Sequence, residues 1–240
     1  MPRANRYILP GHTYHLTHRC HNRSFLFRFA RDRTEYQRRL RSAVKEYKIL
    51  LLTYCITSNH THLVARAKDA ETISGFMQKL EGEFAEYYNL RKRRSGAFWE
   101  GRYWCTMVET GKYVWNCMKY VDLNMVRAGV VGHPSEWEWC GYRELVGERQ
   151  RYRLLDMAEA HSVCGNGPQE SFRTNYRHVI GEPVEREQLA RESCWTESIA
   201  VGSETFVRLI EQDVGNRVEL TVEKAGLSQW IVREARTAYG

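Results

Sequence analysis

Ile49-Leu50-Leu51-Leu52-Thr53-Tyr54-Cys55-Ile56 is an unbroken run of residues that favour β-strands, and the polar pair Ser58-Asn59 follows it closely. The apolar pattern then resumes at His62-Leu63-Val64-Ala65. Serine and asparagine are typical turn residues. This stretch therefore predicts two neighbouring strands joined by a short turn.

In the segments on either side, the spacing of apolar residues is typical in turn of strands and of helices. In chain order they predict a strand at 13–18, a helix at 32–47, the two strands above, a helix at 72–91, a strand at 103–108 and a helix at 112–124. This order suits an α+β fold of the split β-α-β (ferredoxin-like) kind, in which helices cover one face of an antiparallel sheet.

Beyond Gly147 the spacing of apolar residues indicates helices and strands less clearly. We predict one domain over residues 1–146 and a largely helical C-terminal extension over 147–240, with helices at Glu204 to Glu211 and Glu223 to Ala238.

The charge is divided unevenly between these two parts. The whole chain has a net charge of +7, made up of +10 in residues 1–146 (24 Lys and Arg against 14 Asp and Glu) and −3 in residues 147–240 (12 against 15). A basic domain favours a polyanionic partner such as nucleic acid, although many basic proteins have no such partner.

Composition also excludes several classes of protein. We find no apolar stretch of the roughly 18 residues that a membrane helix needs, and no secretory signal at the N-terminus. Seven scattered cysteines lack a Cys-x-x-Cys pair, which indicates reduced, mostly buried thiols. We expect a protein of the cytoplasm that does not bind membranes.

Two short patterns could carry chemistry. Residues two apart on a strand point to the same side, so His60 and His62 could hold one metal ion. Tyr120 and Asn124 are one helical turn apart and would share a face. Taken singly, each has an ordinary alternative: hydrogen-bonded or surface histidines, a core tyrosine and an asparagine that caps a helix.

Five segments in order resemble the HUH-class single-tyrosine transposases, in particular the REP-associated tyrosine transposases. The segments are Pro10-Gly11-His12-Thr13-Tyr14-His15-Leu16-Thr17, Ser58-Asn59-His60-Thr61-His62-Leu63-Val64, Gly96-Ala97-Phe98-Trp99-Glu100-Gly101-Arg102-Tyr103, Lys119-Tyr120-Val121-Asp122-Leu123-Asn124-Met125-Val126-Arg127-Ala128-Gly129 and Trp137-Glu138-Trp139-Cys140-Gly141-Tyr142. Ser58 and Met125 replace prolines of the family pattern. The likeness spans about residues 5 to 146.

The resemblance implies roles for four residues. Tyr120 would be the nucleophile that attacks a DNA phosphodiester, and His60, His62 and Asn124 would hold Mg²⁺ or Mn²⁺. The expected products are a 5′-phosphotyrosine and a free 3′-hydroxyl. Strand transfer by this route needs no ATP, and the sequence has no Gly-x-x-x-x-Gly-Lys phosphate loop.

Single-stranded, hairpin-bearing DNA would be the partner of a monomer or homodimer at the nucleoid. The candidate DNA-binding residues are Arg19, Arg23, Arg91, Lys92, Arg93, Arg94 and Arg102. Phe98, Trp99 and Tyr103 could stack on bases or equally belong to the core. His12, His15, His18 and His21 are three apart, so they cannot converge from one strand, and we interpret them as structural or close to DNA.

Two alternatives to an active transposase remain open at this point. A hairpin-binding protein with a relic site would bind DNA without metal and cleave nothing. A metal hydrolase that activates water at His60 and His62 would leave free 5′-phosphates and would give Tyr120 no role.

Overall fold

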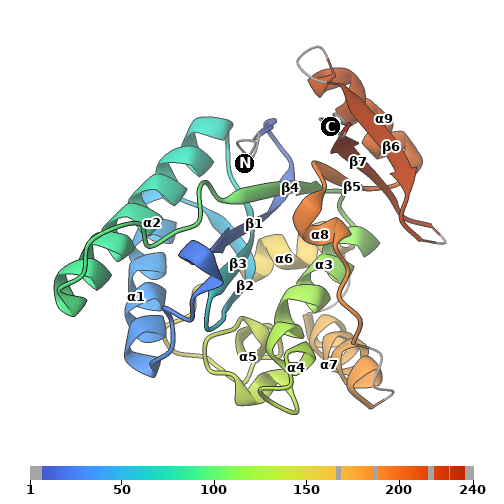
Figure 1. The fold of residues 1–240 in the computed structure, drawn as a ribbon. Coiled ribbons are helices and arrows are strands. Elements are labelled where there is room, and N and C mark those ends of the chain that lie inside the picture. The colour runs from blue at the N-terminus through green and yellow to red at the C-terminus, as the bar shows by residue number, and fades with distance from the viewer. Residues whose placement is uncertain (1–6, 166–168, 186–188, 216–218, 227, 236–240) are drawn as a thin grey trace.

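Seven strands form one sheet in the part of the chain that the structure describes, a computed structural model covering residues 7–165, 169–185, 189–215, 219–226 and 228–235 (Figure 1). The strands are β1 (Thr13–Arg19), β2 (Leu50–Ile56), β3 (His60–Arg66), β4 (Trp104–Val108), β5 (Ala200–Gly202), β6 (Leu220–Lys224) and β7 (Trp230–Glu234). Their order across the sheet is β2-β3-β1-β4-β5-β7-β6.

Helices follow the strands along the whole chain. They are α1 (Ala30–Tyr47), α2 (Ala70–Lys92), α3 (Lys112–Asp122), α4 (Asn124–Arg127), α5 (Tyr142–Leu145), α6 (Met157–Cys164), α7 (Gln169–Glu185), α8 (Cys194–Glu197) and α9 (Glu204–Val214), with short 3-10 turns at η1 (His21–Arg23) and η2 (Pro134–Glu136). The predicted α+β class and the order of the first seven elements are confirmed.

Both faces of the sheet are covered, which corrects the expectation of helices on one face. Thr53 and Tyr54 are neighbours on β2 and point to opposite sides. The Tyr54 hydroxyl accepts a hydrogen bond from Gln37 of α1 at 2.7 Å, whereas the Thr53 hydroxyl donates to Asp122 of α3 at 2.7 Å. The physical reason lies in the unbroken apolar run of β2, which is buried on both sides.

The helix expected over residues 112–124 ends two residues earlier. At Leu123 the backbone has φ −78° and ψ 2°, so α3 stops at Asp122 and a new turn, α4, begins at Asn124. Tyr120 and Asn124 therefore lie on two consecutive helical segments instead of one.

The C-terminal region adds three strands to the same sheet. β5 runs parallel to β4, with Met107 opposite Ala200, and β7 then pairs with β5 and β6 (Figure 1). The helix predicted at 204–211 is confirmed by α9.

The helix predicted from Glu223 to Ala238 is wrong within the described residues, and Ala238 itself lies outside them. A hairpin of β6 and β7 occupies the region, with a hydrogen bond from the Ala225 amide to the Gln229 carbonyl at its turn. The β-branched residues Val222, Ile231 and Val232 favour strands, and Gly226 supplies a turn residue.

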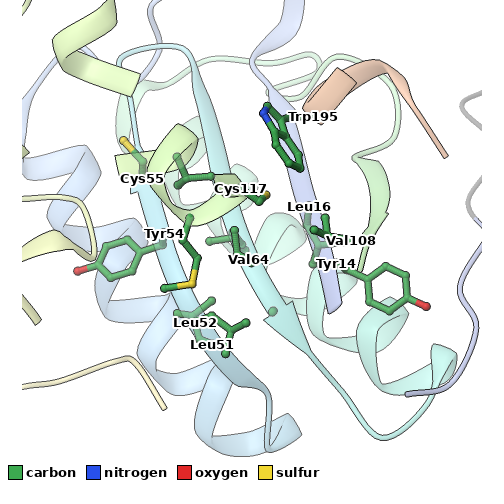
Figure 2. Packing of buried hydrophobic residues seen from close by; sticks show 14 of the residues in the cluster. Tyr14, Leu16, Leu51, Leu52, Tyr54, Cys55, Val64, Val108, Cys117 and Trp195 are labelled. Atoms are coloured by element: carbon green, nitrogen blue, oxygen red, sulfur yellow. The ribbon is translucent and has the colours of Figure 1, made fainter. Parts of the chain in front are cut away.

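A single buried cluster joins the early strands to the C-terminal region. Leu16 of β1, Val64 of β3, Cys117 of α3 and Trp195 of α8 all belong to it (Figure 2). Trp195 is fully buried. The seven cysteines are free thiols and six of them are buried, as expected.

Three aromatic side chains proposed as base-stacking candidates also lie in this core. Phe98, Trp99 and Tyr103 are 2%, 9% and 5% exposed. Phe98 packs edge-on against Phe84 with ring centroids 5.2 Å apart. They are core aromatics and present no surface for bases.

The described residues contain no helix with the length and apolarity needed to cross a membrane.

Candidate active site

A pocket of about 660 Å³ opens where β1 ends and β3 begins. His60 and His62 of β3, Tyr120 of α3 and Asn124 of α4 all line it. The remaining lining residues are Thr17, His18, Arg19, Arg23, Glu100, Arg102, Trp104, Arg127, Ala128, Arg191, Thr196 and Glu197. The structure thus brings together the four residues on which the sequence argument depended.

His60 and His62 face the same pocket because residues alternate along a strand. Their ring centroids are 4.7 Å apart. His60 Nδ1 lies 2.6 Å from Asn59 Oδ1, an atom that can only accept, so Nδ1 carries the proton and Nε2 keeps its lone pair. The pKa of His60 is lowered by burial and by the positive charge of Arg19. The imidazole is therefore neutral, the form that binds metal ions.

His62 is buried between His15 and Asn124. Its Nδ1 lies 2.8 Å from His15 Nε2, and its Nε2 lies 2.9 Å from the side-chain amide of Asn124. Burial, the largest cause, lowers the pKa of His62 well below the ordinary value, so this imidazole is neutral as well.

These donors fit a divalent cation. Two neutral imidazoles and an amide oxygen are a mixed set that suits manganese or zinc, and magnesium is bound with few protein ligands. Amide nitrogen and oxygen exchange places by a half-turn, which would bring Asn124 Oδ1 beside His62 Nε2. The described residues hold no metal-binding group of three or more His, Cys, Asp or Glu, so the third protein ligand here would be the amide.

Tyr120 is the one tyrosine among the residues that line the pocket, and it is 4% exposed. Its ring centroid lies 6.1 Å from that of His62. Burial raises the pKa of the phenol, and the charges of Arg127 and Arg191 oppose that rise. The Arg127 guanidinium lies 4.1 Å above the ring and donates to the Tyr120 carbonyl at 3.0 Å. The phenol is thus neutral in the resting protein, with a cation held against it.

Three of the predicted DNA-binding arginines line this pocket: Arg19, Arg23 and Arg102. Arg19 pairs with His60 across β1 and β3. With Arg127 and Arg191 they give the pocket five arginines against two carboxylates, Glu100 and Glu197, and Glu197 pairs with Arg191. Such a surface suits a phosphodiester chain.

The other four predicted DNA-binding residues lie at the end of α2 and not in the pocket. Arg91 pairs with the buried Asp32, and Arg94 donates to Asn89 Oδ1 at 2.7 Å and to the Ala97 carbonyl at 2.8 Å. Lys92 and Arg93 are exposed. Arg91 and Arg94 are thus committed to contacts within the protein, whereas Lys92, whose ammonium lies 4.7 Å from the Phe29 ring centroid, and Arg93 are open to solvent.

Several residues of the site were missed by sequence reasoning. Arg127 is separated from Tyr120 by the break at Leu123, so its place over the ring could not be read from helical spacing. His15 is a diagonal neighbour of His62 once Thr17 is opposite His62, a signal that appears when the strand register is known. Arg191, Thr196 and Glu197 come from a region without a clear pattern.

Residues 9–124 match the sequence model of the family described as IS200-like transposases. The chain is 24% identical over 123 residues to a Haemophilus influenzae protein described as a proposed REP-associated tyrosine transposase, an alignment that covers 45% of this chain and 70% of that protein. A solved structure, described as a REP-associated tyrosine transposase bound to a REP hairpin, aligns with a TM-score of 0.54 at 16% identity. That alignment covers 65% of this chain and 94% of the other, and it shows a shared fold.

Proposed function

We propose that this protein cleaves single-stranded DNA beside a hairpin and rejoins the ends through Tyr120. The proposal starts from the family: residues 9–124 belong to the IS200-like transposases. The observation that carries the proposal is the pocket, where one phenol, two neutral imidazoles, an amide and five arginines converge. No smaller set of these residues would point to phosphoryl transfer.

Cleavage would begin with Tyr120. Its phenol oxygen attacks the scissile phosphorus and loses its proton, while the bond from phosphorus to the 3′ oxygen breaks and that oxygen is protonated. The products are a 5′-phosphotyrosine and a free 3′-hydroxyl. One phosphodiester replaces another, so a 3′-hydroxyl from a second strand can reverse the step and release Tyr120 without an external energy source.

Chain residues prepare this attack in two ways. Arg127 fixes Tyr120 through its carbonyl and ring and places a cation beside the phenol, which favours the developing phenolate. Arg19, Arg23 and Arg102 would bind the phosphates on either side of the scissile one. Positioning of this kind is a large part of catalysis in phosphoryl transfer.

His60, His62 and Asn124 would hold Mg²⁺ or Mn²⁺ at the pocket wall. When bound, a divalent ion would offset the charge that develops on the phosphate in the transition state. The two imidazoles are neutral, and His60 keeps its lone pair on Nε2, where a metal ion would bind.

The proposed substrate is hairpin-bearing single-stranded DNA. The solved relative contains a REP hairpin, and in this chain residues 1–146 carry a net charge of +10. We expect the protein to work on DNA at the nucleoid, as a monomer or homodimer.

The test is a covalent-adduct assay. Wild-type protein is incubated with labelled hairpin-bearing single-stranded DNA and Mn²⁺, then denatured, and the expected result is a labelled protein band. Tyr120→Phe should lose the band, whereas Tyr113→Phe should keep it, since Tyr113 lies on the same helix outside the pocket. EDTA and matched duplex DNA are the remaining controls.

Other outcomes would favour the alternatives. Hairpin binding that is equal with and without Mn²⁺, together with no cleavage, would favour a relic site. Multiple turnovers that release free 5′-phosphates from Tyr120→Phe would favour a metal hydrolase.

A further inference from the structure

We propose that His15 is a positioning residue: a chain of hydrogen bonds from the Trp195 carbonyl through His15 fixes His62 in the tautomer whose Nε2 lone pair faces the pocket. The inference deepens the proposed function and rests on it for the role of that lone pair. The hydrogen-bond chain itself can be tested without catalysis.

The chain begins at a backbone carbonyl, which only accepts hydrogen bonds. His15 Nδ1 lies 2.8 Å from the Trp195 oxygen, so the proton of a neutral His15 sits on Nδ1. Nε2 of the same ring is then an acceptor. It lies 2.8 Å from His62 Nδ1, which must therefore be the donor.

The hydrogen bond at Nδ1 determines the state of the other ring nitrogen of His62, Nε2. With its proton on Nδ1, a neutral His62 keeps a lone pair on Nε2, the atom that lies 2.9 Å from the Asn124 amide. A metal-binding histidine commonly has its ligating nitrogen selected in this way, through a hydrogen bond at the other nitrogen. The Asn124 amide can present either its nitrogen or its oxygen to Nε2, so it fits both tautomers of His62 and fixes neither, whereas the hydrogen bonds that run from the Trp195 carbonyl through His15 fit only one.

His15 is placed to act as a neutral relay. It is fully buried, and burial, the largest cause, lowers its pKa to about 4. Its ring is nearly coplanar with that of His62, with centroids 5.0 Å apart and an interplanar angle of 14°, as an in-plane hydrogen bond between the two rings requires.

The Trp195 carbonyl, where this series of hydrogen bonds begins, is held in place by the C-terminal region. Trp195 is fully buried on α8, and the segment that follows is fixed to β4 by a bond from the Thr106 hydroxyl to the Ser198 carbonyl at 2.7 Å. A second bond joins the Met107 amide to the Ile199 carbonyl at 2.8 Å. Residues far beyond the family match thus orient a residue within it.

His60 is an internal control for this inference. Its Nδ1 proton is fixed locally by Asn59 Oδ1 and does not depend on His15. A change at position 15 should therefore alter the tautomer of His62 and leave that of His60 as it is.

The experiment measures histidine tautomers in the metal-free full-length protein by NMR with ¹⁵N-labelled histidine. In the wild type, His15, His60 and His62 should each carry the proton on Nδ1. His15→Leu should convert His62 to a tautomer mixture or to Nε2–H. His15→Gln should restore Nδ1–H, because one amide can donate to the Trp195 carbonyl and accept from His62.

Mn²⁺ affinity gives a second reading on the same variants. We expect His15→Leu to weaken Mn²⁺ binding about 10- to 100-fold and His15→Gln to recover most of it. Hairpin binding in EDTA reports whether each variant is folded.

Three results would overturn the inference: His62 found as Nε2–H in the wild type, an unchanged His62 tautomer in His15→Leu, or equal defects in both variants. The wild-type spectrum decides even where a variant fails to fold. A correct tautomer pattern with no covalent adduct would leave the inference standing and refute the proposed catalysis.

Discussion

Arg127 is the residue whose side chain most directly affects the proposed nucleophile. It is partly buried beside Tyr120, with its guanidinium against the ring and one hydrogen bond to the backbone. The charge of Arg127 works against the rise in the pKa of the phenol that burial causes. A cation in this place would stabilise the negative charge on the phenol oxygen, both when Tyr120 attacks the phosphate and when it is released during rejoining.

Arg127→Ala should therefore slow single-turnover cleavage of hairpin DNA by about 10²- to 10³-fold, the usual cost of losing one fixed donor in a transition state. Arg127→Lys should recover part of the rate because it keeps a charge. Arg143→Ala, a change outside the pocket, is the control. Equal rates for Arg127→Ala and wild type would show that the guanidinium has no part in the reaction.

Single residues differ in how far their roles could be predicted. Spacing alone placed His60 and His62 on one side of a strand, and the structure confirms that both line one pocket. His15 could not be assigned in the same way, because its partner is 47 positions away and depends on the register of β1 and β3. Residue spacing predicts which side chains are neighbours within one element, but it does not predict how two elements pair.

At the scale of elements, α3 is tied to both the sheet and α7 by one carboxyl group. Asp122 accepts hydrogen bonds from Thr53 of β2 and Tyr176 of α7, each at 2.7 Å. Burial, the largest cause, raises the pKa of Asp122 to about 7. Near neutral pH, this carboxyl therefore changes charge inside the protein.

The sign of the effect on stability follows from linkage. Between the unfolded pKa of about 3.9 and the folded pKa, the folded state binds more protons than the unfolded state, so the free energy of unfolding falls as pH rises. Buried neutral histidines act in the opposite direction below about pH 6.5, since their folded pKa values are lowered. A comparison with Asp122→Asn cancels their contribution.

We expect the free energy of unfolding of Asp122→Asn, relative to wild type, to increase by about 2 to 3 kcal/mol from pH 5 to pH 8. The asparagine cannot ionise and keeps the size of the side chain. Urea unfolding at several pH values provides the measurement. A difference that stays constant with pH would mean that Asp122 titrates at an ordinary value in the folded protein.

Elements were predicted well where one periodic signal dominated. The continuous run of β2 and the helical spacing of α1 and α2 gave segments that agree with the structure to within a few residues. The β6–β7 hairpin was missed because short segments with few apolar residues also match a helical spacing. Its pairing with β5 is a contact between distant parts of the chain, which local propensity does not contain.

At the scale of the whole molecule, the sheet continues without interruption from the family-like region into residues 147–240. β5 covers the edge of β4, and Trp195 fills the core beside β1 and α3 (Figures 1 and 2). We propose that residues 1–146 and 147–240 work as one unit, with the C-terminal region completing the site through Trp195 and Arg191.

A chain that ends after Val146 should then be defective in both folding and metal binding. It exposes the β4 edge, which favours aggregation, and it loses the acceptor of His15. Gel filtration and Mn²⁺ titration are the measurements. A chain that ends after Ala235 is the control, because all described strands remain. A monomeric 1–146 chain with wild-type Mn²⁺ affinity would contradict the single-unit account.

The most direct test of the central claim is to map the covalent DNA adduct on wild-type protein. After reaction with hairpin-bearing single-stranded DNA and Mn²⁺, nuclease and protease digestion should leave a nucleotide joined by its 5′-phosphate to the peptide that carries Tyr120, and the other DNA fragment should end in a 3′-hydroxyl. An adduct on another residue, or cleavage that leaves a free 5′-phosphate and no adduct, would contradict the account.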